Sequence, residues 1–260
     1  MISTVPPSPP RRIVVGDVHG HYEALVRLLE LIGPRTEDGV YFVGDLIDRG
    51  AGSAQVIHLV RQEGYQTLIG NHEHLLIQAM QDYHELSESL DMHPWYYSGG
   101  METLASYGGK VERLEEDVRW LRQQPFYCDL GDFWLVHAGV RPHCTIAEQH
   151  EHDLCWIRGD FHAIEAPYFA NKTIITGHTI TFTFPNIEPG SVVQGQGWFD
   201  IDTGVYHPRS GWLTALDLDQ QQVYQVNAYS HESRILPLAT VLQPYPNRRH
   251  LTQPIVQLCG

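Results

Sequence analysis

Short apolar runs near the start of the chain alternate with polar loops and amphipathic segments. The apolar runs are residues 13–15, 40–43 and 67–69. After the first loop, apolar side chains recur at helical spacing at Leu25, Leu28, Leu29 and Ile32, and the same spacing returns after the next two loops. Three successive units of strand, loop and helix predict a parallel, right-handed β-α-β-α-β-α half.

The pattern changes in the rest of the chain. Residues 83–125 are aromatic and helical in pattern, which predicts a helical insertion that Pro125 ends. Residues 126–137 are typical of a β-hairpin turning at Gly131 and Asp132. Further strands are predicted at 173–176, 198–201, 212–218 and 223–227. This strand-rich half, mixed or antiparallel, would pack on the first half as an α/β fold: a two-sheet β-sandwich flanked by α-helices.

These patterns predict one domain with two flanking segments. We expect a Pro-rich, disordered leader at 1–12 and a single domain at 13–230 that contains the helical insertion at 83–125. Scattered prolines predict a loosely ordered C-terminal tail at 231–260.

Composition narrows the classes of function. The 260 residues include 17 basic and 31 acidic side chains, a formal net charge of -14, which argues against nucleic acid or anionic membrane as partners. No apolar run is long enough for a membrane span, and the leader lacks the apolar core of a signal peptide. The cysteines form no C-x-x-C pair and are expected to be reduced thiols of a cytoplasmic protein. A phosphorylated substrate would need positive charge supplied locally.

Polar residues follow each of the first three predicted strands. They are Asp17 and His19, then Asp45 and Asp48, then Asn71 and His72. Two later apolar runs break at a histidine beside glycine, at His137 and His178. The carboxyl ends of parallel strands are where open α/β sheets keep their active sites, so these residues are expected to meet.

The nitrogen and oxygen donors in this set are typical of ligands for Mn, Fe or Zn. The candidate ligands are Asp17, His19, Asp45, Asn71, His137 and His178. If Asp45 is shared between two ions, it would hold them roughly 3.5 to 4 Å apart, the arrangement of two-metal phosphoryl chemistry.

Four sequence blocks resemble, in order, the signatures of the calcineurin-like metallophosphoesterases. They are Gly16-Asp17-Val18-His19-Gly20, Gly44-Asp45-Leu46-Ile47-Asp48-Arg49-Gly50, Gly70-Asn71-His72-Glu73 and His137-Ala138-Gly139. Within the family the chain resembles the bacterial and phage form of the phosphoprotein phosphatases, over roughly residues 13 to 218. The resemblance implies a β-sandwich flanked by helices, in agreement with the periodicity.

The resemblance also implies roles for individual residues. One metal would be held by Asp17, His19 and Asp45, and a second by Asp45, Asn71, His137 and His178. A hydroxide between the ions would attack phosphorus directly. His72 would be the general acid that protonates the leaving oxygen, with Asp48 orienting its ring. Arg49 and Arg158 would grip the phosphate oxygens, and Asn71 would also contact the substrate.

The implied activity is hydrolysis of phosphoserine and phosphothreonine proteins and of small phosphomonoesters. The alternative enzyme is a dinucleoside polyphosphate hydrolase acting on diadenosine tetraphosphate; as a group these usually lack the Asp-Arg pair seen here as Asp48 and Arg49. Ala138 stands where eukaryotic phosphatases carry glycine, and their Ser-Ala-Pro-Asn-Tyr segment has no counterpart. A binding protein that has lost activity is a third hypothesis, against which the intact set of site residues argues. A monomer is the favoured oligomeric state.

Several residues have a second interpretation. Arg158 could be a surface cation stacked on Trp156. Residues 202–204, Asp-Thr-Gly, could support the metal ligands, but a simple turn is the favoured interpretation. Residues 95–97, Trp-Tyr-Tyr, could rim the substrate cleft or pack inside the insertion.

Overall fold

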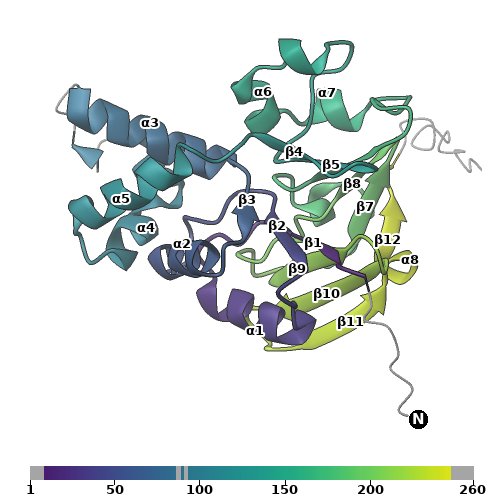
Figure 1. Ribbon diagram of the computed structural model, residues 1–260, viewed down its shortest axis with the longest axis horizontal. Helices are drawn as coiled ribbons and strands as arrows, with labels where there is room; N and C mark the ends of the chain where they lie inside the picture. Colours follow the sequence, from purple (N-terminus) through teal and green to yellow (C-terminus); the bar gives the residue numbers. More distant parts are fainter. Residues whose placement is uncertain (1–8, 86–88, 91–92, 247–260) are drawn as a thin grey trace, which may run out of the picture.

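Two six-stranded sheets lie face to face in the computed structural model, which describes residues 9–85, 89–90 and 93–246 (Figure 1). The first sheet has the order β11-β10-β9-β1-β2-β3. Its strands are β1 (Arg12–Val15), β2 (Gly39–Phe42), β3 (Gln66–Thr67), β9 (Trp212–Asp217), β10 (Gln222–Asn227) and β11 (Ser233–Pro237). β1, β2 and β3 pair in parallel, whereas β9, β10 and β11 are antiparallel to their neighbours.

The second sheet has the order β12-β7-β8-β6-β5-β4. Its strands are β4 (Tyr127–Asp129), β5 (Phe133–Val136), β6 (Thr173–Thr176), β7 (Val192–Gly195), β8 (Trp198–Asp200) and β12 (Leu242–Pro244). β5, β6 and β8 run parallel at its centre, and antiparallel pairs flank them.

Helices cover the outer faces of both sheets. α1 to α5 lie on the side of the first sheet, and α6 and α7 beside β4 and β5 of the second (Figure 1). The helices are α1 (Tyr22–Ile32), α2 (Ser53–Gln62), α3 (Asn71–Glu85), α4 (Met101–Ser106), α5 (Val111–Leu121), α6 (Glu151–Trp156), α7 (Gly159–His162) and α8 (Leu238–Val241). A π-helix, η2 (Tyr96–Gly100), precedes α4, and two 3₁₀ helices are η3 (Ile146–Glu148) and η4 (Thr181–Thr183). Within the described residues, no helix combines the length and apolar character needed to cross a bilayer.

Strand β1 illustrates why the chain forms these layers. Its three apolar residues are fully buried, but Ile13 and Val15 face α1 and α2 while Val14 faces the second sheet. Successive side chains on a strand point to opposite faces, so a continuous apolar run is what a strand covered on both sides requires. The structure thus confirms the predicted α/β class, with two sheets flanked by helices.

The connectivity differs from the prediction in one respect. The parallel order of β1, β2 and β3 and the β4–β5 hairpin are confirmed. However, the second half of the chain does not form the second sheet alone, since β9, β10 and β11 return to the first sheet beside β1. β7 was not predicted, because only Val192 and Val193 of its four residues are apolar.

The described parts of the two flanking segments, residues 9–12 and 231–246, include regular structure that was not predicted. Arg12 begins β1, and the buried guanidinium of Arg11 lies 2.7 Å from the carboxylate of Asp38, so the expected disorder is wrong for these two arginines. The expected loose tail is wrong for 233–244, where β11 and β12 pair with β10 and β7. Pro237 and Pro244 end their strands, positions where the missing N–H is tolerated. Residues 1–8 and 247–260 lie outside the described residues, and the other boundaries stay predictions.

Candidate metal centre and active site

The loops that follow β1, β2 and β3 meet at one edge of the first sheet. His19, Asp45, Asp48 and Arg49 in these loops, and His178 after β6 of the second sheet, adopt positive φ angles between 46° and 72°. Such backbone is unfavourable for residues other than glycine and is typical of functional sites whose surroundings enforce it. Backbone bonds provide that enforcement: the His19 N–H donates to the Asp45 carbonyl at 2.9 Å, and the Gly50 N–H to the His19 carbonyl at 2.9 Å.

The side chain of Glu73 connects the loop that follows β2 with the loop that follows β3. Its fully buried carboxylate accepts the backbone N–H groups of Asp45 and Leu46, each at 2.8 Å, and of Gly70 at 3.0 Å. The first turn of α3 is therefore tied to the segment that carries Asp45. The sequence reasoning did not assign Glu73 a role, although it stands in the Gly70-Asn71-His72-Glu73 block.

Replacing Glu73 with glutamine should destabilise the protein by roughly 2 to 3 kcal/mol, because the new NH₂ group would face a backbone N–H and leave it buried without an acceptor. Urea denaturation followed by circular dichroism measures the change. Glu116→Gln, the same change at an exposed position on α5, is the control. Equal stability of the two variants would show that the carboxylate does not hold the loops.

Asn71, His137 and His178 converge on one point of the site. The Oδ1 atom of Asn71 lies 2.9 Å from His137 Nε2 and 2.8 Å from His178 Nδ1. The other nitrogen of His137, Nδ1, faces the Val43 carbonyl at 2.8 Å and must carry the proton. Burial lowers the pKa of His137, so its Nε2 presents a lone pair to the Asn71 oxygen. Two facing acceptors are stabilised by a cation, and this donor set therefore fits a metal ion.

Asp17, His19 and Asp45 form a neighbouring group. His19 Nε2 lies 3.6 Å from Asp45 Oδ2 and 3.9 Å from Asp17 Oδ2. His19 Nδ1 faces the Ile47 carbonyl at 3.0 Å, and burial and the nearby Arg49 guanidinium lower the pKa of His19, so Nε2 again carries a lone pair. Candidate ligand atoms of His19, Asp45 and His72, and of Asp17, Asp45 and His137, lie within 4.8 Å of one another in each trio.

Asp45 belongs to both groups. Its Oδ1 lies 3.5 Å from His137 Nε2, while Oδ2 faces His19. Burial opposes its ionisation, but the interactions of Asp45 with the imidazoles of His137, His72 and His19 outweigh burial and hold its pKa below the usual range.

Asp17 has the opposite pKa shift. Burial raises its pKa well above the usual value, and repulsion from the neighbouring carboxylates of Asp202 and Asp45 adds to the shift. A buried cluster of carboxylates is stabilised by bound cations, so these residues also fit a metal-dependent site.

His72 and Asp48 form the pair expected for acid catalysis. His72 Nδ1 lies 2.7 Å from Asp48 Oδ2, and Asp48 also accepts the Trp95 indole N–H at 3.1 Å and the Thr103 hydroxyl at 2.6 Å. Burial alone would lower the pKa of His72, but Asp45 and the hydrogen bond to Asp48 outweigh burial and raise it. The protonated ring required of a general acid is thereby favoured.

Arg49 lies across the opening of the site. Its Nη1 and Nη2 atoms lie 2.8 Å from His19 Nε2 and 2.9 Å from His72 Nε2, and its guanidinium stacks 3.9 Å from the Tyr206 ring. The contact with His72 requires a lone pair on Nε2, so this contact and the protonated ring exclude each other. Arg49 must therefore turn away from His72 whenever His72 carries the second proton.

Arg158 lines the same cavity, of about 190 Å³, as Asp45, Asn71 and Arg49. Its Nη1 atom donates to the Thr179 hydroxyl at 2.8 Å. The residues predicted for catalysis, phosphate binding and metal binding therefore lie together at one place. Arg158 is held at the wall of this cavity by its hydrogen bond to Thr179. Two guanidinium groups supply the local positive charge that a phosphate needs on an acidic protein.

Some neighbours of the site were missed or interpreted differently from sequence. Trp95 is fully buried and donates to Asp48, so it packs in the core beside the site and does not rim the cleft. Asp202 does form a local turn by accepting the Gly204 N–H at 2.9 Å, but it is also a buried charge beside Asp17. Thr103 and Tyr206 carried no motif of their own, and only the spatial arrangement places them here.

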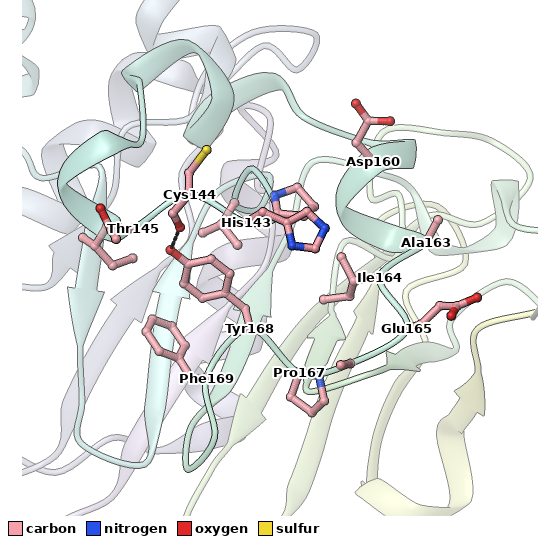
Figure 2. A pocket seen from close by; sticks show the side chains of 14 residues that line it. His143, Cys144, Thr145, Asp160, Ala163, Ile164, Glu165, Pro167, Tyr168 and Phe169 are labelled. Atoms are coloured by element: carbon pink, nitrogen blue, oxygen red, sulfur yellow. Dashed lines mark hydrogen bonds between the residues drawn. The ribbon is translucent and has the colours of Figure 1, made fainter.

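A larger cavity, of about 820 Å³, lies between the segment that follows β5 and the segment that follows α7 (Figure 2). His143 projects into it opposite Tyr168, whose hydroxyl donates to the Cys144 carbonyl at 2.5 Å, and Asp160 and Glu165 stand at its edge. It contains none of the predicted site residues, and carboxylates at its edge do not favour a phosphate. The smaller cavity is the one with the chemistry of a phosphoesterase.

Comparison with known proteins agrees with this geometry. Residues 10–196 match the family model for calcineurin-like phosphoesterases. The chain belongs to the calcineurin-like phosphoesterase family. Among solved structures, a metallophosphoesterase from Sphaerobacter thermophilus has the same fold, with a TM-score of 0.55 and 20% identity over 86% of this chain and 89% of that chain.

Curated relatives in the calcineurin-like phosphoesterase family carry the name bis(5'-nucleosyl)-tetraphosphatase, symmetrical. The protein of Pasteurella multocida is 29% identical over 61% of this chain and 56% of its own length. That of Actinobacillus succinogenes is 33% identical over 51% of this chain and 46% of its own length. The chain thus spans about half the length of these relatives. The expected branch of serine/threonine phosphatases is not confirmed, and these names favour the alternative.

Proposed function

We propose that the protein is a metal-dependent hydrolase of dinucleoside polyphosphates, with diadenosine tetraphosphate as the candidate substrate. The observation that carries this proposal is the pair Arg49 and Arg158 in the cavity that Asp45 and Asn71 also line. Two guanidinium groups beside a candidate two-metal centre suit a chain of several phosphates better than a single phosphate group. The names of the symmetrical tetraphosphatases from Pasteurella multocida and Actinobacillus succinogenes support the same substrate class.

Two groups of residues that share Asp45 would each hold one metal ion. Asp17, His19 and Asp45 would hold one ion, and a second would be held by Asp45, Asn71, His137 and His178. When bound, the two ions would supply Lewis-acid activation of water and of the phosphate. The identity of the ions (Mn, Fe or Zn), the monomeric state and the cytoplasmic location stay predictions.

The protein's own side chains would position the substrate and move the proton. Arg49 and Arg158 would bind phosphate oxygens, and Arg49 would exchange its contact with His72 for a contact with phosphate. His72 would then be free to hold a proton on Nε2 and deliver it to the leaving oxygen. Asp48, held by Trp95 and Thr103, would keep the His72 ring in orientation.

A second candidate is hydrolysis of phosphoserine or phosphothreonine proteins and small monoesters. One specific observation favours it: Asp48 and Arg49 both contact His72, at Nδ1 and Nε2, so the Asp-Arg pair acts on the candidate acid as a unit. The pair is the feature that the sequence shares with phosphomonoesterases.

The two candidates are separated by adding Mn²⁺ to metal-free protein and comparing diadenosine tetraphosphate, a phosphopeptide and an aryl phosphate. We expect kcat/KM to be highest for the dinucleotide, with ADP as the sole nucleotide product. Metal-free protein is the control and should be inactive on all three. A higher kcat/KM for the phosphopeptide would reverse the order of the two candidates.

A further inference from the structure

A second cavity, of about 490 Å³, adjoins the candidate active site on the side of the helical insertion. Arg49 and Tyr206 line both this cavity and the smaller one that contains Asp45 and Asn71. The Arg49 guanidinium lies 3.9 Å from the centre of the Tyr206 ring, so the two cavities share this stacked pair as a common wall. The second cavity therefore adjoins the one beside Asp45, with Arg49 at the boundary between them.

The far wall of this cavity presents aromatic and apolar surface to solvent. Tyr97 is 76% exposed and Met101 is 50% exposed, and Tyr96 packs edge-on against Tyr97 with ring centroids 5.4 Å apart. Exposed aromatic and apolar side chains gathered at one cavity offer a surface on which a flat, apolar ligand group can pack. Glu102 also lines this cavity. Its carboxylate accepts hydrogen bonds from hydroxyl or amino groups and repels phosphate.

This wall is fixed relative to the catalytic residues. Tyr96 and Tyr97 lie on η2, whose backbone is kinked at Gly99, with a φ angle of 111°. The Arg49 N–H donates to the Gly99 carbonyl at 3.1 Å, and a Cβ atom at Gly99 would lie 2.7 Å from the Arg49 nitrogen. Trp95, just before η2, donates to Asp48. The two tyrosines are thus held at a set position beside Arg49.

We propose that this cavity binds the base and ribose of the nucleotide whose phosphate lies at the metal centre. A purine ring would stack on the face of one of the two perpendicular rings, Tyr96 or Tyr97, and contact the other at its edge. The phosphates would continue past Arg49, and Glu102 would accept from the ribose hydroxyls or the exocyclic amine. This inference rests on the proposed dinucleotide substrate. It names the residues that would favour a dinucleotide over a phosphoprotein. Aromatic faces recognise flat bases with little regard to sequence, whereas phosphoserine or phosphothreonine offers no ring to stack.

Calorimetry of ADP and of inorganic pyrophosphate with Mn²⁺-loaded protein tests the base site without requiring turnover. We expect ADP to bind about tenfold more tightly than pyrophosphate, within the range that one stacked base contributes. The preference should disappear in a Tyr96→Ala, Tyr97→Ala double variant and should persist in Tyr97→Phe, which keeps the ring. Tyr127→Ala, which removes an exposed tyrosine of β4, is the control.

The outcomes separate the base site from the proposed substrate. An ADP preference that survives in the double variant, or its absence from the unchanged protein, would overturn the base site even if diadenosine tetraphosphate is hydrolysed. A preference that depends on the tyrosines, in a protein that does not hydrolyse diadenosine tetraphosphate, would support the base site and overturn the proposed substrate. In an active enzyme, Tyr97→Ala should raise the KM for the dinucleotide with little change in kcat.

Discussion

The Asp45→Asn variant is expected to lose at least about 10³-fold in kcat/KM, since metal-derived stabilisation of several kcal/mol would disappear. Asp45 is the carboxylate that faces both groups of candidate ligands, with Oδ1 toward His137 and Oδ2 toward His19. Asparagine has nearly the same shape but is neutral and offers one oxygen, so it cannot serve two cations. We expect metal content, measured by mass spectrometry after dialysis, to fall together with the activity.

Asp129→Asn is a matched control for this variant. It makes the same chemical change at an exposed residue of β4, where Asp129 pairs with Lys172, and it should leave activity and metal content unchanged. Two metals retained with full activity in Asp45→Asn would contradict the bridging role of Asp45.

His72→Asn should retain metal but lower kcat by about 10² to 10³-fold, the contribution of a positioned general acid. The loss should be greatest for an alkyl phosphate, whose leaving oxygen needs a proton, and smallest for an aryl phosphate with an acidic leaving group. His74→Asn, two residues further along α3 at a side chain that packs near Phe126, is the control. An unchanged rate on the alkyl phosphate would remove His72 from the mechanism.

The pH profile gives an independent reading of the same variant. Asp45 and Asp48 raise the pKa of His72 above its ordinary value, and the protonated ring is the active form. The kcat/KM of the unchanged protein should therefore be maintained below this pKa and should fall as pH rises through it. His72→Asn should lack this alkaline decrease.

Much of the fold could be predicted because local patterns determine it. Continuous apolar runs such as 13–15 mark strands covered on both faces, and the hairpin of β4 and β5 turns where Gly131 and Asp132 occur. The return of β9 to pair with β1 could not be predicted, because strand partners far apart in sequence leave no local signal. The order of 233–244 was missed because prolines at strand ends resemble prolines in a loop.

The candidate site was predictable to a different extent. Residues within motifs could be proposed as site residues from the sequence, because their donor atoms follow predicted strands and their blocks resemble those of a known family. Thr103 and Tyr206 were not, because a hydroxyl that bonds to Asp48 and a ring that stacks on Arg49 are defined only by tertiary position. The proposed base site on η2 could not be predicted either, because the aromatic residues at 95–97 were equally consistent with packing inside the insertion.

The position of β1 also has a consequence for how the protein is made. Val15 pairs with Phe42 on one side and with Ala215 on the other, and the Gly16 N–H, at the start of the loop with Asp17 and His19, donates to the Thr214 carbonyl at 2.9 Å. The ribosome must therefore synthesise most of the chain before the central strand has both partners. Until then the growing chain carries an unpaired strand edge, a state prone to slow folding and association with chaperones or other chains. Catalytic competence is thus acquired late in synthesis, although most of its residues emerge early.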